Sequence, residues 1–213
     1  MPLRVAGACA LAAFFTSAIG WIVGDLAQPA AFSPANDDIS DLGALTASSP
    51  WLYNQVGANL TGLLVMAAAL GLWRALRPDV IGRIGAGALF VAGLGSFLDG
   101  LFRLDCQGID AGCVNDSWHA DAHRWESRFT AAATLLAPVI LALAFRRIPG
   151  WRRAWLPSLA ALPAIILANA VFSTLGDGAA VRAGTMAWFA WLAYVGVLLL
   201  AQEEWQAAVS PET

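Results

Sequence analysis

The chain has 213 residues, of which 59% are hydrophobic and only 13% are charged, and its formal net charge is −3. Because soluble domains devote about a quarter of their residues to charge, this composition excludes an ordinary water-soluble domain and requires lipid as the solvent. The net negative charge and the lack of a basic stripe argue against nucleic acid as a partner.

Six apolar stretches are long enough to cross a membrane. A spanning helix needs about 20 mostly apolar residues, and the stretches cover approximately residues 5–26, 52–72, 84–104, 129–145, 155–175 and 186–201. They leave almost no sequence for a separate soluble domain, and the alternation typical of barrel strands is absent. The sequence therefore predicts an all-α fold, a single domain over residues 1–213 that forms an integral membrane bundle of six transmembrane helices.

The first stretch could be a secretion signal, because Arg4 precedes it. Its apolar run from Val5 to Val23 exceeds the roughly 7–15 residues of a signal's apolar region. We therefore expect a retained transmembrane helix.

A long polar loop, residues 28–50, precedes the second stretch and carries Asp41. The second stretch opens with Trp51 and Tyr53, which suit the aromatic belt at a membrane boundary. Asn54 follows, and an amide within a span is costly unless it faces protein or water. Asn54 therefore either hydrogen-bonds to a neighbouring helix or lines a cavity, and the sequence leaves both open.

Ionisable residues gather between the third and fourth stretches. Asp99 and Arg103 are four residues apart and lie on one helix face, where with Asp105 they form either an ion-pair network or part of a site. If the segment with His119 and His123 is helical, the two histidines have the spacing of a two-histidine metal pair. Otherwise they belong to a hydrated loop, where they cap the next helix or hydrogen-bond to acids.

Two cysteines, Cys106 and Cys113, flank a short flexible loop beyond the third stretch. On the oxidising side of a membrane such a pair forms a disulfide, which the sequence predicts here. Ligation of a metal by the two thiolates is the alternative.

The arginines predict the orientation of the bundle. All twelve basic residues are arginine, a bias typical of a high-GC bacterial genome. With the N-terminus in the cytoplasm, the positive-inside rule is obeyed. The cytoplasmic arginines are then Arg4, Arg74, Arg77, Arg83, Arg146, Arg147, Arg152 and Arg153, and the outer ones are Arg103, Arg124, Arg128 and Arg182. We therefore predict a multi-pass protein of a bacterial inner (cytoplasmic) membrane with both termini in the cytoplasm.

Several short motifs resemble one known family. The segments Ile39–Gly43 and Phe102–Cys106, together with Asn54, His119 and His123, are similar to the prokaryotic membrane family catalogued as domain of unknown function 998. Members have about six spans, so the resemblance covers nearly the whole chain. It implies that these outer-face residues form a common site, but it implies no particular activity.

A second likeness is to the membrane hydrolases related to alkaline ceramidases and adiponectin receptors, which use Ser, Asp and three His around zinc. Ser96, Asp99, His119 and His123 echo that set of residues. The chain departs from the pattern because it lacks a third histidine and a seventh helix.

The sequence thus predicts a polar site at the outer face that binds a small molecule, a lipid headgroup or a metal. Its predicted ligand-binding residues are Asp41, Asn54, Asp99, Arg103 and Asp105, and its predicted metal ligands are His119 and His123. A divalent metal such as zinc would lower the pKa of bound water and allow hydrolysis of a lipid-linked ester or amide. No catalytic residue is assigned, and whether the chain is an enzyme stays open. The alternative is a non-catalytic accessory subunit that packs against a larger membrane complex, so the expected partners are membrane lipids and further membrane-protein subunits.

Overall fold

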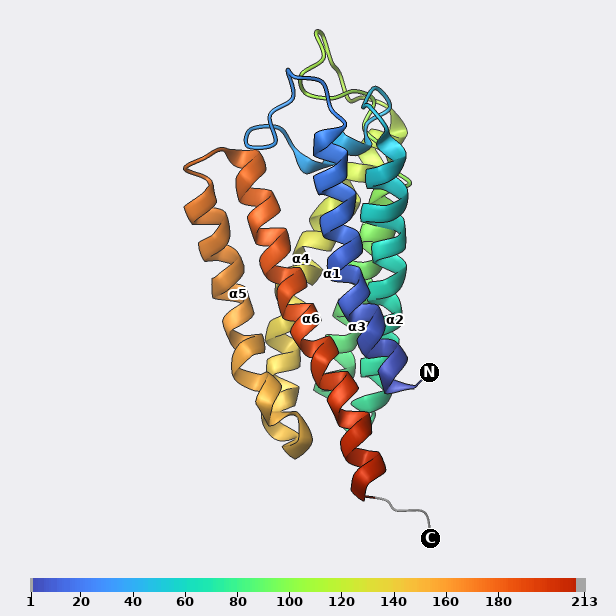
Figure 1. Cartoon of the computed structure of the whole chain (residues 1–213), viewed down its shortest axis with the longest axis vertical. Coiled ribbons are helices and arrows are strands. Elements are labelled where there is room, and N and C mark those ends of the chain that lie inside the picture. Colours follow the sequence, from blue (N-terminus) through green and yellow to red (C-terminus); the bar gives the residue numbers. More distant parts are fainter. Residues whose placement is uncertain (1, 210–213) are drawn as a thin grey trace.

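The computed structural model describes residues 2–209. Within this range the chain is helical and contains no strand (Figure 1). Six helices are long and apolar enough to span a membrane, which confirms the predicted all-α bundle of six transmembrane helices. The elements are α1 (Leu3–Leu26), the 3-10 helix η1 (Ile39–Gly43), the π-helix η2 (Leu52–Leu60), α2 (Thr61–Ala75), α3 (Val80–Asp99), α4 (Trp118–Arg147), the 3-10 helix η3 (Pro149–Trp151), α5 (Arg152–Phe172) and α6 (Asp177–Val209).

The helices α4 and α6 begin well before their predicted starts. α4 starts at Trp118 instead of near residue 129 because Ser117 caps it: the Ser117 hydroxyl accepts the N–H of Ala120 at 3.2 Å. α6 starts at Asp177 instead of near residue 186, with an acidic residue in its first turn, where the helix dipole favours it. The histidine segment is therefore helical.

The helices pack around one core in which α1 contacts α2 and α6, α3 contacts α2 and α4, and α5 contacts α4 and α6. Three connections, residues 27–51, 100–117 and 173–176, gather at one end of the bundle, and the start of α1 and the end of α6 lie toward the opposite end (Figure 1). We call the first of these the loop end. The direction in which the bundle crosses the membrane remains a prediction.

Glycines bring α1 very close to its neighbours. A Cβ atom placed on Gly20 would lie 2.3 Å from the Cα atom of Gly57, and one on Gly7 would lie 2.6 Å from the carbonyl oxygen of Gly196. Small residues allow this approach between membrane helices. These small-residue faces are therefore occupied by helices of the same chain.

A buried ion pair ties α1 to α6 near the loop end. Arg182 donates from Nη2 and Nε to the Asp25 carboxylate at 2.7 and 3.2 Å, and from Nη1 to the carbonyl oxygen of Asp37 at 2.9 Å. Both side chains are almost fully buried. Through Asp37, the pair also holds the first loop against the bundle. The sequence counted Arg182 only as a charge on the outer side and did not predict this role.

Candidate functional site

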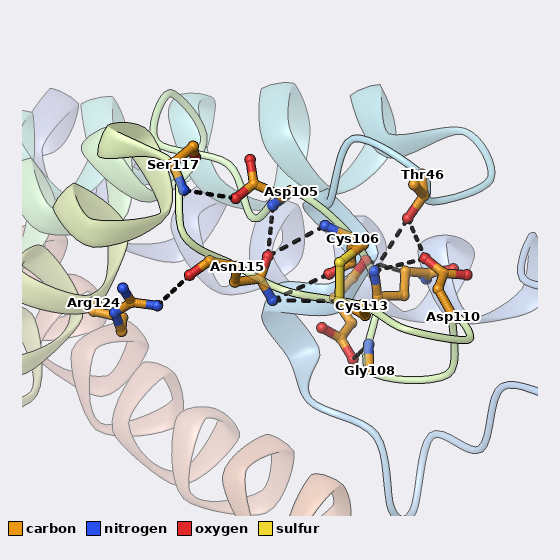
Figure 2. Close-up of a disulfide and its surroundings, with 11 residues drawn as sticks. Thr46, Asp105, Cys106, Gly108, Asp110, Cys113, Asn115, Ser117 and Arg124 are labelled. Atoms are coloured by element: carbon orange, nitrogen blue, oxygen red, sulfur yellow. Dashed lines mark hydrogen bonds between the residues drawn. A yellow bond between two sulfur atoms is a disulfide. The ribbon is translucent and has the colours of Figure 1, made fainter.

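The predicted disulfide between Cys106 and Cys113 is confirmed (Figure 2). Beside it, the Asn115 side-chain oxygen accepts the N–H groups of Asp105 and Cys106 at 2.6 and 3.2 Å. The bridge and Asn115 together close residues 105–115 into a compact loop that leads directly into the cap of α4.

Arg103 and Asn54 hold the η1 segment against the bundle. The Arg103 guanidinium donates to the carbonyl oxygens of Gly43 and Ala44 at 2.8 and 2.9 Å. The Asn54 amide donates to the same Gly43 oxygen at 3.0 Å. The structure thus brings these two predicted ligand-binding residues to one backbone carbonyl.

Asp41 lies apart from the histidines. It is buried, and its carboxylate accepts the N–H of Gly108 at 3.1 Å, which links η1 to the disulfide loop. Burial raises the pKa of Asp41, and the nearby acids Asp38, Asp37 and Asp110 add to this against the opposing hydrogen bond from Gly108.

The two histidines contact different acids. His119 Nε2 lies 3.4 Å from the Asp105 carboxylate, and His119 Nδ1 lies 2.6 Å from the carbonyl oxygen of Arg103. Hydrogen bonds from Ser117, through its side chain and its backbone N–H, lower the pKa of Asp105. His123, one turn further along α4, faces Asp99 instead.

Asp99, His123 and Glu126 form a compact cluster between α3 and α4. Asp99 is the last residue of α3, while His123 and Glu126 lie one turn apart on α4. His123 Nδ1 is 3.1 Å from an Asp99 oxygen and 4.0 Å from a Glu126 oxygen, and the three ligand-type atoms lie within 4.8 Å of one another. We call these residues the three-residue cluster.

Neighbouring hydroxyls orient both carboxylates of the cluster. The Tyr53 hydroxyl donates to Asp99 Oδ2 at 2.9 Å and leaves Oδ1 toward His123. Ser127 and Thr130 each donate to one Glu126 oxygen, at 3.0 and 3.1 Å. Tyr53 belongs to η2, and π-helical segments within α-helices occur frequently at functional sites.

His123 Nδ1 is buried and has no hydrogen-bond partner. Asp99 Oδ1 is close enough, but it does not lie in the direction of a hydrogen bond from Nδ1. Two donor atoms bound to one metal at 2.0–2.2 Å in tetrahedral geometry lie roughly 3.3–3.6 Å apart. The spacing of His123 Nδ1 and Asp99 Oδ1 therefore suits two ligands of a shared cation.

A narrow crevice connects the three-residue cluster to the η1 segment. Its lining includes Tyr53, Asp99, Arg103 and His123, together with Ser40 and Gly43 of η1. In this conformation it is too narrow to admit a molecule the size of water. The prediction that Asp99 and Arg103 share one helix face is wrong, because α3 ends at Asp99 and Arg103 lies in the following loop. Arg103 forms no ion pair with Asp99, but it lines the crevice beside the cluster.

Sequence analysis left two members of this arrangement out of the site. Glu126 had a usable signal, since it follows His123 by three residues and so shares its helix face. Tyr53 was assigned to the aromatic belt, and nothing in its spacing indicated a bond to Asp99. Shared metal ligation by His119 and His123 stays a prediction.

The sequence model of one family, described as "Protein of unknown function (DUF998)", matches residues 10–201. This range includes every residue of the site. No curated protein and no solved structure matches the chain.

Proposed function

The chain belongs to the DUF998 family, and we propose that it binds a divalent metal ion such as zinc at Asp99, His123 and Glu126. The observation that carries this proposal is the buried His123 Nδ1, which has no hydrogen bond and faces two carboxylates. A buried polar atom without a partner costs free energy, and a bound cation would remove that cost.

The surroundings of the cluster support a metal site. Ligands in such sites are usually oriented by hydrogen bonds from further residues, which is the role that Tyr53, Ser127 and Thr130 would have. One imidazole and two carboxylates make three protein ligands and leave a fourth position for water or substrate, as in catalytic zinc sites. A metal there would lower the pKa of bound water, so hydrolysis of an ester or amide is the reaction class that the site favours.

The depth of the cluster favours a lipid-linked substrate. α3 has 20 residues and ends at Asp99, so its length of about 30 Å equals the thickness of the hydrocarbon layer. Asp99 then lies at the level where lipid headgroups begin. We further propose that this end faces outside the cytoplasm, because a disulfide and the smaller group of arginines lie there.

Metal analysis tests the proposal. We expect the purified protein, loaded with cobalt, to show the visible absorption of a protein-bound ion. His123→Gln and Glu126→Gln should both abolish it. His119→Gln is the matched control on the same helix and should retain it.

Two outcomes would change the proposal. Loss of the absorption in the His119→Gln variant as well would favour the two-histidine pair predicted from the sequence. An unmodified protein that binds no metal would leave the cluster as a structural network and would favour the accessory-subunit function.

A further inference from the structure

Arg103 is a cation that lies beside the three-residue cluster. Its side chain lines the crevice together with Asp99 and His123. Among the described residues, no carboxylate forms an ion pair with it. A partly buried guanidinium without an acid partner is unusual, because burial of a charge is costly unless it is paired.

The guanidinium is fixed by its contacts on one side only. Nε and Nη2 donate to the carbonyl oxygens of Gly43 and Ala44. Nη1 donates no hydrogen bond to any described residue, so it remains able to bind a ligand. A guanidinium held in one orientation is suited to an oxyanion, which it binds through charge-assisted hydrogen bonds.

The charge balance of the site also favours an anion. Two carboxylates of the cluster would neutralise a divalent cation, and the neutral imidazole adds no charge. Arg103 then leaves an excess of about one positive charge next to the open metal position. An anionic ligand that touches both the metal and Arg103 would remove that excess.

We infer that Arg103 forms an anion subsite beside the three-residue cluster, and that the ligand of the site carries a phosphate group. The inference rests on the proposed metal site for the second contact of the phosphate. The shared chemistry fits a lipid headgroup phosphate or a free phosphate compound. Binding of either ligand would require the crevice to widen. Ser40 and Gly43 line the crevice and belong to η1, which lies outside the spanning helices, so a shift of η1 would widen it.

A titration of the cobalt-loaded, full-length protein with glycerol 1-phosphate tests the inference. We expect the cobalt absorption to change and saturate. Arg103→Gln should raise the half-saturating concentration about tenfold or more, because it removes a charged hydrogen bond. Arg124→Gln is the matched control, since Arg124 bonds to Asp121 and the Asn115 carbonyl instead.

A second measurement separates this inference from the metal proposal. In metal-free protein the phosphate loses its contact with the metal, so glycerol 1-phosphate should raise the unfolding temperature of the unmodified chain and of Arg124→Gln by less than in metal-loaded protein, and should not raise that of Arg103→Gln. If cobalt does not bind, the metal proposal fails, and this temperature shift alone decides on the anion subsite. If cobalt binds but Arg103→Gln titrates like the unmodified protein, the anion subsite is refuted and the metal site stands.

Two further arms complete the test. If Arg103→Gln does not fold, Arg103→Lys replaces it, and weaker binding than in the unmodified protein is the supporting result, while equal binding refutes the subsite. Protein in phosphatidylcholine nanodiscs with and without phosphatidic acid identifies the source. A cobalt spectral change with phosphatidic acid indicates a lipid headgroup, and a change with glycerol 1-phosphate alone indicates a free phosphate compound.

Discussion

His123 Nδ1 lies 3.1 Å from Asp99 Oδ1 across the interface of α3 and α4, yet the two atoms are not aligned as a hydrogen bond. The contact joins the last residue of one membrane helix to the second turn of the next. Both side chains are largely buried. A cation bound between the two atoms would satisfy both of them, as proposed for the three-residue cluster.

The Tyr53 hydroxyl should control the affinity of the cluster for metal. Tyr53→Phe removes the hydrogen bond to Asp99 Oδ2 and allows that carboxylate to rotate. Loss of such an orienting contact typically lowers metal affinity about 10–100-fold. The measurement is the dissociation constant of cobalt or zinc by competition with a chelator.

Tyr194→Phe is the control for this prediction. The Tyr194 hydroxyl donates to the carbonyl oxygen of Arg153. Arg153 lies at the start of α5, at the end of the bundle opposite Asp99. Its affinity for metal should equal that of the unmodified protein. Equal affinity in Tyr53→Phe as well would show that Tyr53 does not orient the cluster.

The disulfide should stabilise the loop end measurably. Replacing Cys106 and Cys113 by Ser opens a loop with a sequence separation of 7. For so short a loop the expected loss is about 2 kcal/mol in the free energy of unfolding, at the low end of the usual range. Thermal unfolding should therefore shift down in the double variant, and a reductant should shift the unmodified protein but not the variant.

Cys9→Ser provides the control, because Cys9 is the free cysteine of the described chain. It should keep the response to reductant. Unfolding that is the same with and without reductant in the unmodified protein would contradict a stabilising bridge.

Most of the fold followed from length and apolarity, because six stretches of spanning length have few other solutions in lipid. The starts of α4 and α6 could not be predicted in this way, because their first turns are polar and lack the apolar pattern of a spanning helix. These turns are helical because of a cap and tertiary packing. The disulfide followed from two cysteines in one short loop. The sequence could not predict that His119 and His123 contact different acids. Helical spacing shows that the two histidines share one face, but it does not show which acid of α3 or of the following loop each one meets.

The buried Asp41 carboxylate should make stability depend on pH. Its pKa is raised by burial, so the folded state binds a proton more tightly than the unfolded chain does. The stability from this proton is complete below the usual aspartate pKa of about 3.9 and is lost as the pH rises through the raised value. Asp41→Asn should remove this dependence, which thermal unfolding across mildly acidic pH measures.

Asp105→Asn should give the opposite sign. Hydrogen bonds from Ser117 lower the pKa of Asp105, so its contribution is complete above the usual aspartate pKa and is lost as the pH falls through the lowered value. The two variants should therefore diverge from the unmodified protein at opposite ends of the acidic range. Parallel profiles for all three proteins would mean that neither carboxylate is coupled to folding.

The orientation of the bundle can be tested with single cysteines in a Cys9→Ser background. Thr174 and Pro78 are exposed in turns at opposite ends of the bundle, Thr174 at the loop end and Pro78 between α2 and α3. The excess of arginines on the Pro78 side predicts that this end is cytoplasmic. A membrane-impermeant thiol reagent applied to spheroplasts should therefore label the Thr174→Cys variant at once and the Pro78→Cys variant only after lysis. The disulfide keeps Cys106 and Cys113 from reacting, and lysed membranes show that both new cysteines are accessible. Labelling of Pro78→Cys alone in intact spheroplasts would reverse the topology and would place the proposed metal site on the cytoplasmic side.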